Sequence, residues 1–406
     1  MRANFESIGP FLLGIPFGIA PYIGPVSISG KITYFEAILS IIVCAIILIK
    51  RKVHSPRKLH EGLALLLNFW VILSWAFFSL RRDLEINASL FMFRQLYFLG
   101  LMLAIPTLIQ NNQYIIRALY GLLFGLMITL FWGWFVWFIS PRFYDTGIPM
   151  YHVIFDVPEG WEINRNYSGY FVLITFAIAL GVVQRLKFKV PIIFFVGVTG
   201  LFTFSKGTWL GLFVIALGSY ITSPILYNTQ KKIISAFLSM IVFACFLLVS
   251  FRFDLHRPFI EKILTSQEQI SQRWHLISDS YHVIKNFPIF GSGPGTFKEA
   301  SAQYGYWGKS ADPHNTLLWL ASEVGIFSAV LFLLIIIATI WKSYKKASHK
   351  NGLPETLLNR TVFLFLLMLL SQLPLHGLPY SMSSTWFILG VVGAIRYTRT
   401  RCQCTH

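Results

Sequence analysis

Uninterrupted apolar runs of about 18 or more residues recur along this chain of 406 residues, and runs of that length are typical of membrane-spanning helices. The lipid interior offers no hydrogen-bond partner to a bare backbone, so a spanning segment must be a helix or part of a closed barrel. The apolar residues here are continuous rather than alternating with polar ones, which favours helices. Only 13% of the residues are charged, against about a quarter in a soluble domain. The sequence therefore predicts an all-α polytopic membrane protein.

The apolar runs predict about twelve transmembrane helices. We expect them near residues 8–24, 32–50, 61–80, 88–109, 115–139, 167–184, 190–204, 207–223, 232–251, 314–341, 359–377 and 380–396. The chain then divides into three parts. We expect nine helices in residues 1–251, a loop subdomain on the outer face in residues 252–313, and the last three helices and a basic tail in residues 314–406.

The basic residues predict how the chain is oriented. With the N-terminus inside, the inner loops contain "KRKVHSPRKLH", "QRLKFK", "NTQKK", "WKSYKKASHKNG" and the tail "RYTRTRC", and all of them are basic. Positive charge marks the cytoplasmic side, so both termini are expected there and the long loops 140–166 and 252–313 outside. The net charge of +17 is thus explained by orientation and by contact with anionic lipids, and not by nucleic-acid binding.

Neither the cysteines nor any short motif predicts a cofactor or a metal. Cys44 and Cys245 lie in apolar runs, and Cys402 and Cys404 lie in the basic tail, where reduced thiols are expected. The chain has no HExxH, no P-loop, no GxSxG and no acidic pair on its outer face. Phosphate chemistry here would therefore depend on Lys and Arg rather than on Mg²⁺.

The long loop 252–313 contains a predicted amphipathic helix. In "QISQRWHLISDSYHVIKNF" the residues Ile270, Trp274, Ile277, Tyr281 and Ile284 recur in steps of three and four, which places them on one helix face. Such a helix lies along the membrane surface or caps the bundle. The glycine-rich segment "PIFGSGPGTF" that follows predicts a turn-rich loop.

The first candidate for chemistry is His314, in "DPHNTLLWLASEVG". Pro313 disfavours helix at the residue before it, so the span is expected to start at about His314, at the water–lipid boundary. The positive helix end disfavours an imidazolium, so the ring is expected to be neutral and able to take a proton. The alternative is an interfacial histidine without a function. Glu323 lies two and a half turns further on, so we expect it to make a structural polar contact inside the bundle.

Two cations are expected on the same outer face. Lys206 lies in the tight turn of "FTFSKGTWLG", on the side where positive charge has no role in orientation, so it is a candidate for binding an anion. Arg273 lies beside Trp274 and offers a forked donor suited to phosphate oxygens. The alternatives are a snorkelling lysine and a solvated surface arginine. Arg94 and Glu36 are lesser candidates, because ionisable groups in apolar runs are costly.

These motifs resemble those of the O-antigen ligase and polymerase superfamily of bacterial envelope glycosyltransferases. "HNTLLWLASEVG" resembles its His-Asn…Glu-x-Gly signature, and "FTFSKGTWLG" resembles its Thr-x-Ser-Arg-Gly turn. "QRWHLISDSYHVIKNFPIFGSGPGTF" resembles its Arg-led helix and glycine loop, and "EINRNYSGY" resembles its Asn-containing start of a span. The four stretches occur in the family's order between about residue 160 and residue 330.

The resemblance implies a transfer reaction at the periplasmic face of the bacterial inner membrane. The donor would be a glycan on polyprenyl diphosphate, and the acceptor a sugar hydroxyl of lipid A–core or of another glycan. His314 matches the catalytic base and Arg273 the arginine that binds the diphosphate. Lys206 stands where the family has a second arginine, a departure that removes the bidentate fork. The other expected substrate-binding residues are Arg165, Asn166, Arg252, Arg257, Trp274 and Asn315.

The residues leave three functions open. A ligase transfers finished polysaccharide to lipid A–core, and this is the first hypothesis. A polymerase uses the same donor and chemistry but extends the glycan. A transporter or flippase fits twelve spans equally well, but it would place its polar site near the midplane, whereas the candidate residues here lie at the outer boundary.

Overall fold

The computed structural model describes residues 2–18, 58–79, 86–109, 111–139, 165–183, 186–202, 205–222, 266–305, 313–347, 354–375 and 383–395. Within these ranges the secondary structure consists of helices, without a strand, which agrees with the predicted all-α class. Four of the described helices are long and apolar enough to cross a membrane. They are α3 (Leu59–Ser79), α5 (Asn112–Ile139), α14 (Ile326–Ala347) and α15 (Pro354–Gln372).

The other described helices mostly coincide with the expected spans. They are α1 (Arg2–Gly18), α4 (Ile86–Leu108), α6 (Arg165–Val182), α7 (Leu186–Phe202), α8 (Lys206–Ile221), α11 (Ser266–Asn286), α12 (Phe297–Tyr304), α13 (Thr316–Val324) and α17 (Ser383–Ala394). The expected spans 32–50 and 232–251 lie outside the described residues, as does Glu36. The count of twelve spans therefore stays a prediction.

The single helix expected at residues 314–341 was wrong, because the chain breaks it at Gly325. This residue ends α13 with φ +98°, and α14 starts at the next position. A side chain at Gly325 would place a Cβ 1.8 Å from the carbonyl oxygen of Ile289. The close approach of the Ile289 backbone to Gly325, and not the hydropathy of the run, determines where the helix ends.

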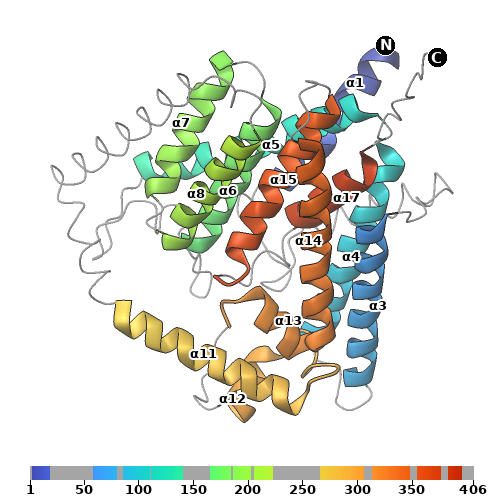
Figure 1. Cartoon of the computed structure of the whole chain (residues 1–406), viewed down its shortest axis with the longest axis vertical. Coiled ribbons are helices and arrows are strands. Elements are labelled where there is room, and N and C mark those ends of the chain that lie inside the picture. The colour runs from blue at the N-terminus through green and yellow to red at the C-terminus, as the bar shows by residue number, and fades with distance from the viewer. Residues whose placement is uncertain are drawn as a thin grey trace, which may run out of the picture.

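Most described helices pack side by side, whereas α11 crosses one end of the bundle next to α12 and the start of α13 (Figure 1). The core lies among α3, α4, α5, α6, α14, α15 and α17, and its largest fully buried side chain is Trp386. Small residues allow the closest contacts. Gly14 of α1 and Gly121 of α5 lie against each other's backbones, where an added Cβ would be 1.9 Å from a carbonyl oxygen.

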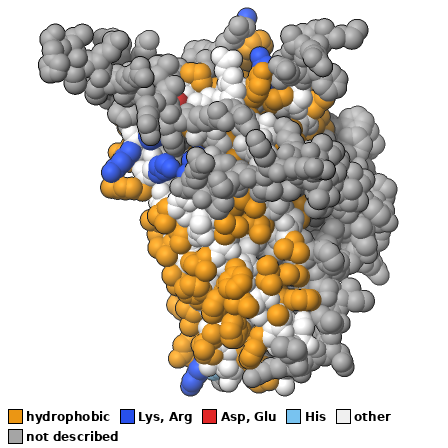
Figure 2. Space-filling view, turned by 90° about the vertical axis from the view of Figure 1, so that its right-hand side faces the viewer, with side chains coloured by type: hydrophobic (Ala, Val, Ile, Leu, Met, Phe, Trp, Pro, Cys, Tyr) orange, Lys and Arg blue, Asp and Glu red, His pale blue; other side chains and the backbone are white. Residues whose placement is uncertain are grey.

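The outer surface of α3 and α14 is apolar. Figure 2 shows exposed hydrophobic side chains over a broad area of this side of the molecule, with Lys and Arg beyond it toward the ends. Phe69 and Phe77 on α3 and Phe327 and Trp341 on α14 are among the exposed residues. An apolar belt of this kind on long apolar helices suggests a membrane protein.

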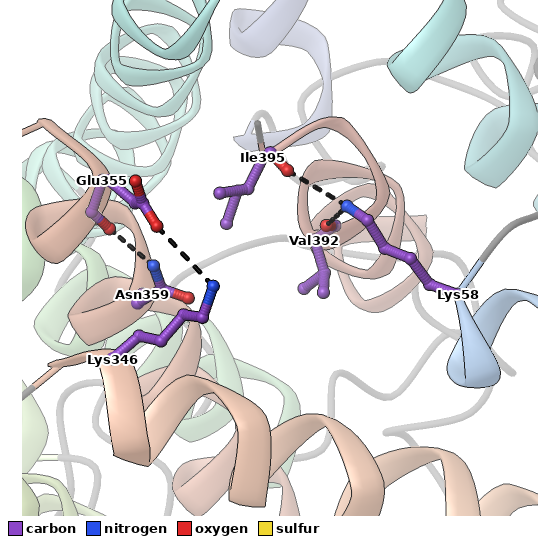
Figure 3. Close-up of polar contacts among 6 residues, drawn as sticks. All are labelled: Lys58, Lys346, Glu355, Asn359, Val392 and Ile395. Atoms are coloured by element: carbon purple, nitrogen blue, oxygen red, sulfur yellow. Dashed lines mark hydrogen bonds and ion pairs between the residues drawn. The ribbon is translucent and has the colours of Figure 1, made fainter. Parts of the chain in front are cut away.

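The end of the bundle opposite α11 carries the basic contacts drawn in Figure 3. The Lys58 ammonium donates to the carbonyl oxygens of Val392, Gly393 and Ile395, at 2.8, 2.6 and 3.1 Å, where α17 ends. Burial lowers the pKa of Lys58 to about 8, and the nearby carboxylate of Glu61 opposes this change. The ammonium is therefore still mostly charged at pH 7 and neutralises the negative end of α17.

Candidate functional site

The His-Asn motif and the Ser-Lys-Gly turn meet at the C-terminal end of α15. The backbone N–H of Thr316 donates to the carbonyl oxygen of Leu373 at 2.9 Å. The side-chain amide of Gln372 donates to the carbonyl oxygen of Gly207 at 3.0 Å, and Gln372 is buried. Gln372, the last residue of α15, and Leu373, which follows it, thus hold two motifs that are more than 100 residues apart in the sequence.

The sequence predicted that a helix starts at about His314. In the structure His314 lies just before that helix. Asn315 is the N-cap of α13, and its Oδ1 accepts from the N–H groups of Leu317 and Leu318 at 3.0 and 3.1 Å. His314 precedes this cap with φ +48°, in the left-handed region, and its side chain is exposed. A left-handed histidine carries strain that proteins retain mostly at functional sites, which makes His314 a stronger candidate.

Lys206 is the first residue of α8. Its neighbour Ser205 is the N-cap, and the Ser205 hydroxyl accepts from the N–H of Thr208 at 3.4 Å. The start of α6 packs against the same turn, because a Cβ at Gly169 would be 1.9 Å from the Thr208 hydroxyl oxygen. Arg165 and Asn166 are the first two residues of α6, so this end of the bundle also carries them.

Arg273 lies on α11, whose packing on α12 and α13 connects it to the His314 segment. Val283 of α11 packs with Phe297 and Ala300 of α12, and Trp319 of α13 contacts this cluster. Arg273 lies ten residues before Val283, and both Arg273 and Trp274 are exposed. The described contacts therefore bring the backbone next to Lys206 and the backbone next to His314 to the end of α15, and they connect Arg273 to this end only through α11. Arg252 and Arg257 lie outside the described residues.

Glu323 makes the structural contact that its position predicted, and it makes it with the glycine loop between α11 and α12. Its carboxylate accepts from the N–H groups of Gly295 at 2.8 Å and Phe297 at 3.1 Å. The residue is 3% exposed. Charge-assisted hydrogen bonds of this kind are about twice as strong as neutral ones, so Glu323 fixes α12 and the loop against α13.

Backbone contacts complete this junction, which we call the glycine-loop junction (residues 288–297 against residues 322–326). The N–H groups of Ser292 and Gly293 donate to the carbonyl oxygens of Ser322 and Glu323, at 2.8 and 3.0 Å. Gly291 has φ +71°, and a Cβ there would lie 2.2 Å from the carbonyl carbon of Glu323. The glycines are thus required by contact with α13, a reason that the sequence alone did not reveal.

The helix α3 supports the junction from the membrane side. The Trp70 indole N–H donates to the carbonyl oxygen of Val324 at 3.1 Å, and the Trp70 ring stacks on Phe290 at 5.1 Å between centroids. The Ser74 hydroxyl donates to the carbonyl oxygen of Phe290. Sequence reasoning missed these two residues, because a Trp and a Ser in an apolar run carry no signal of what they contact.

Comparison with known proteins identifies the segment that contains most of this site. Residues 191–333 match the sequence model of the O-antigen ligase family. The match supports the O-antigen ligase and polymerase superfamily that the motifs resemble. No curated protein matches the chain. The family supports a membrane glycosyltransferase of the O-antigen ligase type, whose partners are in general a lipid-linked glycan and an acceptor.

The O-antigen ligase segment contains Lys206, α11, the glycine-loop junction and His314, whereas Arg165 and Asn166 precede it. The end of α15, which holds the His-Asn motif and the Ser-Lys-Gly turn together, also lies outside the matched segment. Among the described residues, no group of three or more His, Cys, Asp or Glu side chains is arranged to hold a metal ion. The His314 segment offers one exposed imidazole among the described side chains.

Proposed function

We propose that this chain is an O-antigen ligase, which transfers a glycan from polyprenyl (undecaprenyl) diphosphate to a sugar hydroxyl of lipid A–core. The observation that supports this most is the meeting of two motifs at the end of α15, because it brings the His314 segment to the Lys206 turn. Family membership of residues 191–333 supports the same reaction class. The site would face the periplasm, at the end of the bundle opposite the basic contacts of Lys58.

The reaction needs a base, and His314 is our candidate. The acceptor hydroxyl attacks the anomeric carbon of the donor sugar while the bond from that carbon to the diphosphate oxygen breaks. The hydroxyl proton passes to the His314 imidazole, and polyprenyl diphosphate leaves with the bonding electron pair. Attack opposite the leaving group inverts the anomeric carbon. The exposed side chain of His314, just before the N-cap, is open to such an acceptor.

Cations would stabilise the leaving diphosphate without a metal ion. Arg273 offers a bidentate guanidinium, and Lys206 adds a point charge at the N-terminus of α8, where the helix dipole favours an anion. An ammonium binds the diphosphate less well than a guanidinium does, so Arg252 and Arg257 would share this contact with Lys206. Electrostatic stabilisation of this kind is commonly the largest catalytic contribution in a partly dry site.

The remaining candidates would position the sugars. The Oδ1 of Asn315 already caps α13, so its Nδ2 is the group that would donate to a substrate oxygen. Arg165 and Asn166 would contact the donor from the start of α6, and Trp274 would offer its ring to a sugar or to the polyprenyl chain. A glycan polymerase would use the same donor and the same residues, and it differs from the ligase only in its acceptor.

The test is a lipopolysaccharide gel of a bacterial host that lacks this gene, complemented with the wild type or with His314→Ala. A ligase predicts loss of every band above core, accumulation of polyprenyl-linked polymer, and rescue by the wild type alone. Core that carries a single repeat unit would instead identify a polymerase. A normal ladder in the deletion strain would contradict both transfer functions on lipopolysaccharide.

A further inference from the structure

The helix α11 buries an unexpected face. One side of the helix carries Leu276, Asp279, Ser280 and Val283, all of which are buried, and Val283 packs with Phe297 and Ala300 of α12. Two of these four are polar, and both are completely buried. We call these residues the bundle face of α11. The apolar residues that the sequence placed together are therefore not what attaches this helix to the rest of the protein.

Three of the five residues of the predicted apolar stripe point away from the bundle instead. Trp274 is 66% exposed and Tyr281 is 61% exposed, and Ile277 between them is also exposed. These three residues form the apolar face of α11. Removal of large apolar side chains from water is favourable, so an apolar face left in water would forgo that stabilisation. We therefore expect an apolar environment to cover this face.

The third side of α11 is polar. Successive residues turn by about 100° around a helix, so Ser271, Ser278 and His282 fall on a side that is neither the bundle face nor the apolar face. We call this side the polar face. The three faces share the helix circumference about equally. A helix that lies in a membrane surface beside a protein has these three environments, namely protein, lipid and water.

Two cations mark the borders of the apolar face. Arg273 falls between the apolar face and the bundle face, and Lys285 between the apolar face and the polar face. Both are exposed, whereas the acidic Asp279 is buried in the bundle face. Lys and Arg beside Trp and Tyr are typical of a helix at the headgroup layer of a membrane with anionic lipids.

The apolar face also leads toward the lipid-facing surface of the bundle. Ile289, three residues past the end of α11, is 60% exposed. Its neighbour Phe290 contacts the exposed Phe77 of α3 at 4.8 Å between ring centroids. Phe327, the second residue of α14, is exposed as well and contacts Trp70. Exposed apolar groups thus continue from the end of α11 to the belt on α3 and α14.

We propose that α11 is an interfacial helix whose apolar face, Trp274, Ile277 and Tyr281, inserts into the headgroup and acyl-chain boundary of the bilayer. The occupant of this face is the lipid surface, and Arg273 and Lys285 contact the phosphate groups of lipids. Taken with the proposed function, this placement gives Arg273 a second property. It lies where the bilayer meets the bundle, at the depth at which a diphosphate on a polyprenyl chain would arrive.

The test measures what surrounds each face in the full-length protein. The four cysteines are replaced by serine, and single cysteines are introduced by Ile277→Cys, Tyr281→Cys, Ser271→Cys and Ser278→Cys. Each variant carries a nitroxide spin label in nanodiscs of phosphatidylethanolamine and phosphatidylglycerol. Electron paramagnetic resonance then reports the collision of the label with oxygen, which concentrates in lipid, and with a nickel chelate, which stays in water.

The proposal predicts a several-fold higher ratio of oxygen to nickel collisions at positions 277 and 281 than at the matched positions 271 and 278. High nickel collision at all four positions would show that the apolar face lies in water and would overturn the proposal. Low collision with both reagents at 277 and 281 would show that protein covers the face, a second copy included, and would overturn it equally.

The labels report contact with lipid and not transfer, so this result is separate from the test of the glycosyltransferase. A variant that loses the fold is recognised from its melting temperature and replaced by labelling at Trp274→Cys, on the same face. A further variant, Tyr281→Asp, provides an independent measurement. We expect it to lower the oxygen collision of a label at position 277 several-fold, whereas Ser278→Asp is expected to leave it unchanged.

Discussion

The two ends of the bundle are held together by different kinds of contact. At the α11 end, backbone meets backbone through glycines, and one buried carboxylate, Glu323, accepts from two N–H groups. At the opposite end, the contacts are made by flexible cations. Lys58 donates to the last carbonyls of α17, and Lys346 pairs with Glu355 at 3.7 Å. The site end therefore depends on a backbone geometry that few substitutions preserve, and the opposite end depends on charges that other side chains could replace.

The largest effect is expected from a methyl group at the glycine-loop junction. Gly325→Ala places a Cβ against the Ile289 carbonyl at a φ that alanine disfavours, and we expect a loss of about 4 kcal/mol or more. Thermal unfolding in detergent measures this. The matched control is Gly62→Ala at the opposite end, where a Cβ meets nothing within 4 Å and helix propensity favours alanine. Equal melting temperatures for the two variants would contradict the comparison.

A smaller loss is expected when the buried carboxylate becomes an amide. Glu323→Gln leaves one of the two N–H groups, of Gly295 or Phe297, facing an amide NH₂, and we expect a cost of about 3 kcal/mol. The control is Glu299→Gln, an exposed residue of α12, with an expected change of less than about 0.5 kcal/mol. If the two variants melt alike, Glu323 does not hold the junction.

At the opposite end, removal of the cation that caps α17 has a moderate expected effect. Lys58→Met deletes the ammonium bonded to three carbonyl oxygens, and we expect a cost of about 1.5 kcal/mol, because Lys58 is only partly buried. Lys58→Arg is expected to recover much of it, in contrast to any replacement of Gly325. Lys345→Met is the control at an exposed position of α14, where the ammonium lies over the Trp341 ring at 4.7 Å and, among the described residues, bonds to no helix end.

The smallest expected effect on stability distinguishes the two roles of Asn315. Asn315→Ala removes the N-cap of α13 and is expected to cost about 1 kcal/mol, whereas Asn315→Asp keeps an accepting oxygen and the stability. Transfer activity then decides the second role. If the Asn315 amide donates to substrate, Asn315→Asp stays several-fold below the wild type despite its restored melting temperature. Full activity of this variant would show that Asn315 only caps α13 and does not donate to the substrate.

The positions of the helices were largely predictable from hydropathy, because a run such as 359–377 has one plausible structure in lipid and became α15. The break at Gly325 was not predictable, since it depends on the Ile289 backbone 36 residues earlier in the chain. The helix α11 was predicted from the spacing of its apolar residues, but which of its sides is buried was not predicted. Asp279 and Ser280 are completely buried, and burial of polar residues on a helix that packs on α12 and α13 is not encoded in the period of its apolar residues.

The members of the candidate site come from the sequence motifs, whereas the contacts that arrange them come from the structure. His314 and Asn315 were identified from the motif, but the left-handed φ of His314 and the Thr316–Leu373 bond depend on the end of α15, outside the matched segment. Glu323 was expected to make a structural contact and does so. The roles of His314, Arg273 and Lys206 in transfer stay predictions, because they concern substrates and not contacts within the chain.

The most direct test of the account is the transfer rate of purified His314→Ala in liposomes that contain a polyprenyl-diphosphate-linked glycan and lipid A–core. Loss of a general base costs about 100-fold or more, and the exposed position of His314 predicts a melting temperature close to that of the wild type. A loss of this size with the fold intact is the result we predict. Transfer near the wild-type rate by a folded His314→Ala protein would contradict the assignment of this end of the bundle as the active site.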